Sequence, residues 1–147
     1  MALDEFGYRV SDERSKGSGR ARAIGRWVIA AAMCWIGVRH FTDPEPFVRI
    51  VPRALPAPLW LVWVSGAAEI AGGLGLLWKP TRRAAGWGLV ALFVAVFPAN
   101  INMAVNDIAV GGRALPPAVL WGRLLLQPVF IALAVWAAEL RSGRDAR

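Results

Sequence analysis

Five polar side chains occur in or beside long apolar stretches of the sequence, where they could carry chemistry inside a membrane. They are His40, Glu69, Asn100, Arg123 and Gln127. Ionisable residues in lipid are costly, and they usually form pairs or serve a function. Donors and acceptors that converge beside an apolar surface are also the usual composition of a small-molecule site. We therefore expect these side chains to form a polar cluster that binds the headgroup of a lipophilic molecule.

The spacing of these residues predicts their arrangement. Arg123 and Gln127 are four residues apart, so they share one face of a helix. Pro98 and Pro128 lack an amide hydrogen and are expected to kink the helices beside the polar positions. We expect an ion pair between Glu69 and Arg123 in the interior of a helix bundle, with the other three polar side chains nearby.

A purely structural role is the alternative for the same residues. A buried ion pair can fix the order and register of helices without binding any ligand. Four small residues surround Glu69 and would let a neighbouring helix approach closely. They are Ser65, Gly66, Gly72 and Gly73. Trp121 has two interpretations as well, either as one wall of a ligand site or as an anchor at the membrane interface.

Other chemistries lack their signatures in this sequence. The single cysteine, Cys34, allows neither an intrachain disulfide nor a Cys-x-x-Cys relay. One histidine and one cysteine cannot fill a usual metal shell, and no phosphate loop, nucleotide motif or catalytic triad is found. We therefore expect no metal and no permanently bound cofactor, and we do not expect an enzyme that acts by itself.

Composition indicates that membrane-spanning helices must position these residues. Of 147 residues, 56% are hydrophobic, and the mean hydropathy is +0.45, which is too apolar for a typical soluble domain. Four continuous apolar runs are each long enough to cross a ~30 Å hydrocarbon layer as a helix. They cover residues 21–41, 58–78, 84–105 and 115–138. The sequence therefore predicts an all-α, polytopic membrane protein with a bundle of four transmembrane helices.

The segments outside the apolar runs are expected to form tails and loops around one membrane domain, residues 21–140. Residues 1–20 are polar and predict a flexible tail, and residues 141–147 predict a short basic tail. The first external loop, residues 42–57, mixes prolines with apolar residues, which suits a short interfacial segment. A secretory signal explains the first run less well, because too few apolar residues precede its Ala-x-Ala pattern.

Basic residues predict the orientation of the helices. The net charge is +7, but the charges lie between the apolar runs and not along one face, which argues against nucleic-acid binding. Arginine and lysine concentrate before the first run, after the second and after the fourth, which places both termini in the cytoplasm. With a rise of ~1.5 Å per residue, Glu69, Arg123 and Gln127 then lie roughly 17, 12 and 18 Å from the outer ends of their helices.

The polar residues and their neighbours resemble the DoxX and DoxX-like family of small four-span bacterial membrane proteins. The similar stretches are His40-Phe41 with Pro44 and Phe47, Ile50-Val51-Pro52, Ser65-Gly66 with Glu69 and Gly72-Gly73, Phe97-Pro98-Ala99-Asn100 with Met103, and Trp121 with Arg123-Leu124 and Gln127. Leu125 departs from the family, in which proline is frequent at this position. The resemblance implies a four-helix bundle in the bacterial cytoplasmic membrane and matches all five polar residues to motif positions.

The resemblance also suggests a function. Members of that family are linked to thiosulfate:quinone oxidoreductase, to membrane redox assemblies and to maturation of a periplasmic amine dehydrogenase. It therefore implies an accessory subunit of a membrane redox system, in which Arg123, Gln127 and Asn100 bind a non-covalent quinone-like or other lipophilic molecule. The alternative is a non-enzymatic scaffold or assembly factor that contacts membrane lipid and either protein partners or further copies of itself. A proton path through Glu69 is a third interpretation, because buried carboxylates can relay protons.

Overall fold

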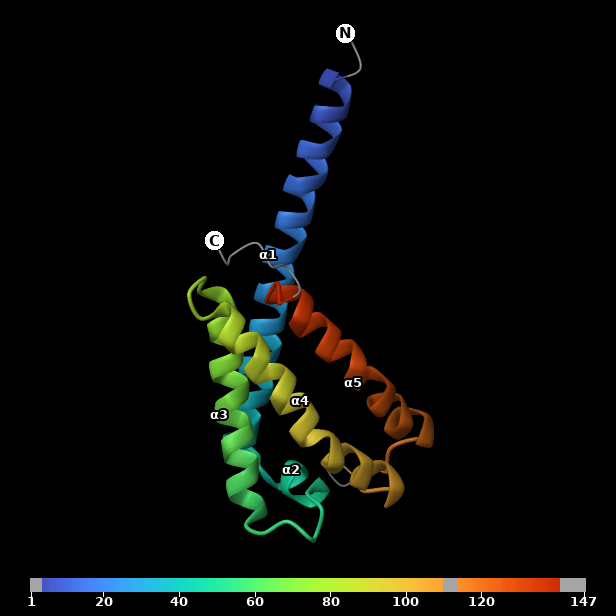
Figure 1. Ribbon diagram of the computed structural model, residues 1–147. Coiled ribbons are helices and arrows are strands. Elements are labelled where there is room, and N and C mark those ends of the chain that lie inside the picture. The colour runs from blue at the N-terminus through green and yellow to red at the C-terminus, as the bar shows by residue number, and fades with distance from the viewer. Residues whose placement is uncertain (1–3, 110–113, 141–147) are drawn as a thin grey trace.

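Helices account for all regular structure in the part of the chain that the structure describes, residues 4–109 and 114–140, with side chains from residue 19 onward. In this computed structural model the helices are α1 (Asp4–Thr42), α2 (Glu45–Ile50), α3 (Pro58–Leu77), α4 (Arg82–Val105) and α5 (Pro117–Ala137) (Figure 1). The prediction of an all-α fold is confirmed.

Four helices contain segments that are long and apolar enough to cross a membrane. They are Gly19–Thr42, Pro58–Leu77, Arg82–Val105 and Pro117–Ala137. Their bounds lie within two residues of the predicted runs. Proline begins both α3 and α5, where its missing amide hydrogen costs nothing because the first turn of a helix has no acceptor for it. The protein is therefore a multi-pass membrane protein.

Helix α1 begins earlier than the sequence predicted. Its first residue is Asp4, so the polar segment that we expected to be a flexible tail continues the first spanning helix. Extending an existing helix avoids the cost of nucleation, and the glutamate, lysine and arginine residues of this segment have good helix propensity. The predicted basic tail, residues 141–147, lies outside the described residues.

The loop between the first two spans carries the short helix α2, where a short interfacial segment was predicted. The Asn102 side chain of α4 donates a 2.9 Å hydrogen bond to the carbonyl oxygen of Ile50, the last residue of α2. Ile50 also packs against a buried cluster from α4 and α5, formed by Met103, Ala104 and Leu120. These contacts hold the loop against one end of the bundle.

The order of the helices around the bundle decides which side chains can meet. Helix α3 packs against α1 and α4, whereas α5 packs along α4 and touches α1 at fewer positions. Figure 1 shows that α5 approaches α1 near its own C-terminal end and diverges from α1 and α3 toward its N-terminal end. Consequently α3 and α5 are not neighbours at the level where the polar side chains lie.

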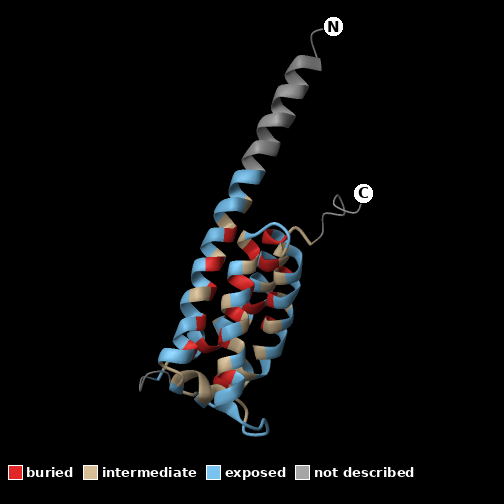
Figure 2. Ribbon diagram, turned by 90° about the vertical axis from the view of Figure 1, so that its left-hand side faces the viewer, coloured by how far each residue is buried: buried red, intermediate tan, exposed pale blue. Residues whose placement is uncertain are grey.

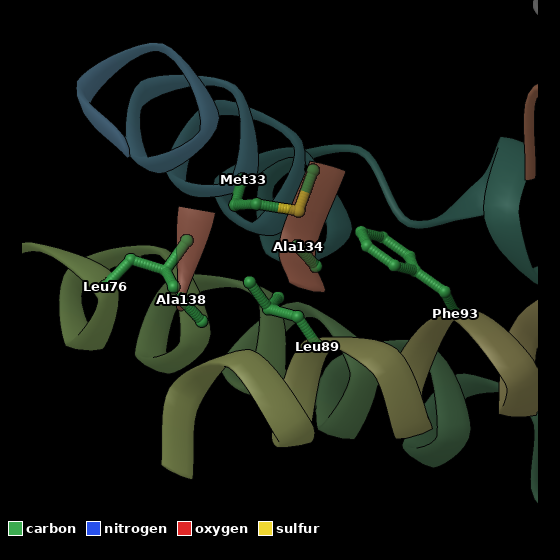
Figure 3. Close-up of a cluster of buried hydrophobic side chains, with 6 residues drawn as sticks. All are labelled: Met33, Leu76, Leu89, Phe93, Ala134 and Ala138. Atoms are coloured by element: carbon green, nitrogen blue, oxygen red, sulfur yellow. The ribbon is translucent and has the colours of Figure 1, made fainter. Parts of the chain in front are cut away.

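The hydrophobic core lies where all four spanning helices come together. It contains Met33 of α1, Leu76 of α3, Leu89 and Phe93 of α4, and Ala134 and Ala138 at the end of α5 (Figure 3). Buried residues are a minority of each spanning helix (Figure 2), and the exposed remainder includes many large apolar side chains. Such an exterior suits contact with lipid tails, which are as apolar as the side chains themselves.

Candidate functional site

The predicted ion pair between Glu69 and Arg123 is wrong. Glu69 of α3 faces His40 of α1, whereas Arg123 of α5 hydrogen-bonds to Asn100 of α4. The reason is the order of the helices, since α3 packs against α1 and α4, and α5 packs mainly against α4. The five polar residues therefore form two clusters, His40 with Glu69 and Asn100 with Arg123 and Gln127.

The first cluster joins the end of α1 to α2 and α3. His40 Nδ1 lies 2.8 Å from the carbonyl oxygen of Ile36 and 3.3 Å from Glu69 Oε2. A carbonyl oxygen can only accept, so Nδ1 carries a hydrogen and donates it to Ile36. The imidazole ring also stacks on Phe47 of α2, with 3.9 Å between the ring centroids. His40 lies in the last turn of α1 and is 6% exposed, between α1, α2 and α3.

Glu69 is a buried carboxyl group with incomplete hydrogen bonding. The residue is 9% exposed, and its buried Oε2 atom has no hydrogen-bond partner in the described part of the chain. The Nδ1 hydrogen of His40 is already directed to Ile36, so the 3.3 Å contact with Glu69 is electrostatic in character. Because an unpaired buried carboxyl group is costly, Glu69 depends on the adjacent imidazole.

Two glycines bring α1 and α3 close enough for this contact. A Cβ atom at Gly37 would lie 2.7 Å from the backbone oxygen of Gly66, and a Cβ atom at Gly66 would lie 2.6 Å from His40 Cβ. Two turns further along α3, a Cβ atom at Gly73 would lie 3.0 Å from Met33 Cβ. The prediction that small residues around Glu69 admit a neighbouring helix is confirmed at three glycines. The neighbour is α1 at Gly66 and Gly73, and it is α4 at Gly72, where a Cβ atom would lie 2.5 Å from Leu89.

The second cluster is a chain of hydrogen bonds between α4 and α5. Asn100 Nδ2 donates to Gln127 Oε1 at 2.7 Å, and Gln127 Nε2 donates to the carbonyl oxygen of Phe93. This carbonyl lies one residue before Val94, whose carbonyl oxygen Pro98 cannot bond because proline has no amide hydrogen. Gln127 is 5% exposed and satisfied at both ends of its amide, so it fixes the side chain of Asn100.

Arg123 lies at the open end of this chain. Its side chain is exposed, and within the described residues its one hydrogen bond runs from Nη2 to Asn100 Oδ1 at the long distance of 3.4 Å. A guanidinium group has five N–H donors. Most N–H donors of Arg123 therefore have no acceptor among the described residues, whereas the amides of Asn100 and Gln127 bond mainly to the protein.

Trp121 does not share a site with Arg123. Residues two apart are about 200° apart around a helix and do not face each other. Trp121 is 53% exposed on α5, so its ring suits the role of an interface anchor.

Sequence reasoning missed three groups that complete the clusters. They are the ring of Phe47 and the backbone carbonyls of Ile36 and Phe93. A backbone carbonyl group is present in every residue, so the sequence does not show which one accepts a side-chain hydrogen bond. Pro98 did predict a kink in the helix near Phe93. Phe47 carries no polar group, and its stacking on His40 depends on how the loop folds back.

Gln127→Leu is expected to destabilise the protein by about 1–2 kcal/mol, because it leaves Asn100 without its acceptor. The measurement is thermal unfolding in detergent. Asn106→Leu is the matched control, since Asn106 is exposed at the end of α4 and its amide bonds, among the described residues, to Asn102 one turn earlier. Equal stability of Gln127→Leu and wild type would contradict the hydrogen-bonded role of Gln127.

Comparison with known proteins places this arrangement in a family. No curated protein and no solved structure was found to match the chain. One family model matches residues 29–140, which include all four spanning segments except the start of the first, and both polar clusters. The chain therefore belongs to the family described as a domain of unknown function (DUF8561).

Proposed function

We propose that this integral membrane protein is an accessory subunit of a membrane redox system that binds a quinone-like headgroup at Arg123. The observation that supports the proposal is the exposed guanidinium group of Arg123. Among the described residues it donates one long hydrogen bond, to Asn100. A quinone carbonyl oxygen is an acceptor that these free donors can satisfy. The resemblance to the DoxX family points to the same class of function.

The second cluster would orient the guanidinium group for such a ligand. Gln127 holds Asn100, and Asn100 Oδ1 in turn accepts from Arg123 Nη2. Val119 and Leu126 lie four residues before and three residues after Arg123, hence on the same side of α5, and both are exposed. An isoprenoid tail or a quinone ring could pack on these apolar side chains while Arg123 binds the polar headgroup.

The same proposal includes an orientation. We place the protein in a bacterial cytoplasmic membrane with both termini in the cytoplasm, because the basic residues around the start of the spanning segment Gly19–Thr42 and at the start of α4 favour that side. Arg123 is the seventh residue of α5, which puts it about 9 Å from the outer end of that helix. A long arginine side chain at this depth can extend toward the headgroups and meet a ligand there.

The test is purification of tagged wild type and Arg123→Ala from native membranes in mild detergent, with mass spectrometry of lipophilic molecules that copurify. We expect wild type to carry a quinone and Arg123→Ala to carry about tenfold less, since the loss of a charge-assisted hydrogen bond weakens binding by this order. Arg49→Ala is the control, because Arg49 is a paired arginine on α2. Wild-type quinone content equal to that of an unrelated four-helix membrane protein would overturn the proposal.

A non-enzymatic scaffold or assembly factor is the second candidate. The observation in its favour is that the buried polar groups join helices: His40 and Glu69 connect α1 with α3, and Asn100 and Gln127 connect α4 with α5. In this case the same preparation would contain a constant protein partner and no specific lipophilic molecule, and Arg123→Ala would leave the amount of that partner unchanged.

A further inference from the structure

A group of arginines lies at the opposite end of the bundle from Arg123 and has no part in the proposed function. Arg22 Nη1 of α1 lies 3.3 Å from Glu139 Oε1, and Arg26 Nη2, one turn further along, lies 4.0 Å from the same oxygen. Arg82, the first residue of α4, is close enough to Arg26 to interact with it electrostatically. We call these four residues, Arg22, Arg26, Arg82 and Glu139, the arginine cluster.

The arginine cluster contains more positive than negative charge. Among the described residues, the guanidinium groups of Arg22 and Arg26 share the Oε1 atom of one carboxylate, and Arg82 adds a third positive charge close to Arg26. Arg82 donates its Nε hydrogen to the carbonyl oxygen of Leu76 at the end of α3, so this contact adds no negative charge. Like charges held together at the edge of an apolar bundle repel strongly, and a further anion would relieve that repulsion.

Arg26 provides a second, independent observation. The residue is 8% exposed, its Nε atom donates to the carbonyl oxygen of Arg22 at 3.2 Å, and its Nη1 atom is buried without a hydrogen-bond partner among the described residues. A buried donor without an acceptor costs the full desolvation penalty of that group. The guanidinium group of Arg26 therefore lacks an acceptor on the side of Nη1.

We propose that the arginine cluster binds the phosphate group of an anionic membrane lipid. The planar fork of arginine matches a phosphate group in two parallel hydrogen bonds, and basic sites between spanning helices are suited to such headgroups. The rim of the cluster is open, since the side chains of Arg22 and Glu139 are 37% and 31% exposed. A shift of these two side chains lets a phosphate oxygen reach Arg26 Nη1.

The surroundings of the cluster place it at headgroup level. Arg22 lies near the start of the spanning segment Gly19–Thr42. Trp136 of α5 packs on α1 beside the cluster, where a Cβ atom at Gly25 would lie 2.5 Å from its ring, and Trp27 next to Arg26 is 66% exposed. Tryptophan is enriched at the level of the lipid headgroups, so a lipid phosphate, with its acyl chains along the bundle, fits this position.

The test is native mass spectrometry of delipidated full-length protein in detergent with added phosphatidylglycerol, phosphatidylcholine or inorganic phosphate. We expect wild type to bind phosphatidylglycerol in preference to phosphatidylcholine and Arg22→Gln to bind it about tenfold more weakly. Glu139→Gln should bind it more tightly, because the carboxylate competes with the phosphate group for the same arginines. Circular dichroism verifies that each variant is folded.

Two control variants separate this site from a general effect of charge. Arg39→Gln removes a positive charge and Glu45→Gln removes a negative charge, both near the other end of the bundle, and both should bind phosphatidylglycerol like wild type. Equal binding by wild type, Arg22→Gln and Glu139→Gln would overturn the proposed site. Binding of inorganic phosphate without binding of phosphatidylglycerol would overturn the assignment to a lipid.

Discussion

Gly37→Ala is expected to destabilise the packing of α1 on α3 by about 3 kcal/mol, at the upper end of the range for overpacked positions. The added Cβ atom would lie 2.7 Å from the backbone oxygen of Gly66 and 2.7 Å from Ile70 Cγ1. A backbone atom in the middle of a helix cannot move aside as a flexible side chain can, so the two helices must separate. Separation of α1 from α3 would also pull His40 away from Glu69.

The measurement is unfolding of the purified variant in detergent by heat or by increasing dodecyl sulfate. Gly88→Ala is the matched control, because a Cβ atom at this position in α4 meets nothing within 4 Å. Alanine is the better helix former, so the control should be neutral or slightly stabilising. If Gly37→Ala were as stable as Gly88→Ala, then α1 and α3 would not pack as closely as described.

His40→Ala is expected to cost about 1–3 kcal/mol, the usual effect of leaving a buried polar group without a partner. The substitution removes the group nearest to Glu69 Oε2 and the ring that stacks on Phe47 of α2. Exposed Arg39 is the control position, because its ion pair with Asp43 on the surface is worth at most about 1 kcal/mol, so Arg39→Ala should have a small effect.

A double-mutant cycle with Glu69→Gln isolates the contact from the loss of ring packing. Without the carboxyl group of Glu69, the imidazole of His40 has no buried acid to contact. The double variant should therefore lose less free energy of unfolding than the sum of the losses in the two single variants. We expect a coupling energy of about 1–3 kcal/mol for this pair. Strictly additive effects would mean that Glu69 and His40 are buried side by side without depending on each other.

The Glu69→Gln variant also tests whether the contact between His40 and Glu69 has a scaffold role. A scaffold that needs this cluster for helix order should lose folded protein in the membrane when the contact is weakened. A stable variant at wild-type abundance that no longer supports the partner enzyme would instead assign a functional role to the carboxyl group. Protein level and activity therefore have to be measured on the same membranes.

Much of the fold followed from local properties of the chain. Apolar runs of about 20 residues predict spanning helices because lipid leaves the backbone no other way to satisfy its hydrogen bonds. The loop prolines likewise indicated the place of α2. The start of α1 at Asp4 was missed because a polar composition describes the environment that a segment prefers, and a helix that is already formed can extend into water at little cost.

The sequence predicted which polar residues lie inside the bundle, but it did not predict which of them contact each other. Arg123 and Gln127 share a helix face by spacing alone, and the link from Asn100 to both fits that prediction. The pairing of Glu69 was misassigned because counting along a helix yields depth in the membrane and nothing about the neighbouring helix. Glu69 and Arg123 have similar predicted depths, yet their helices pack against different partners.

Residue type and hydropathy by themselves determined that this chain crosses the membrane four times and carries polar groups inside it, because burial in lipid depends on each segment separately. The tertiary structure alone decided that Glu69 meets His40 and that Arg123 keeps free donors. These contacts depend on which helices are adjacent, and adjacency here is set by paired glycines on α1 and α3 and by the hydrogen bonds between α4 and α5. Each of these interhelical contacts needs residues from two helices, so the sequence of one helix by itself does not predict it.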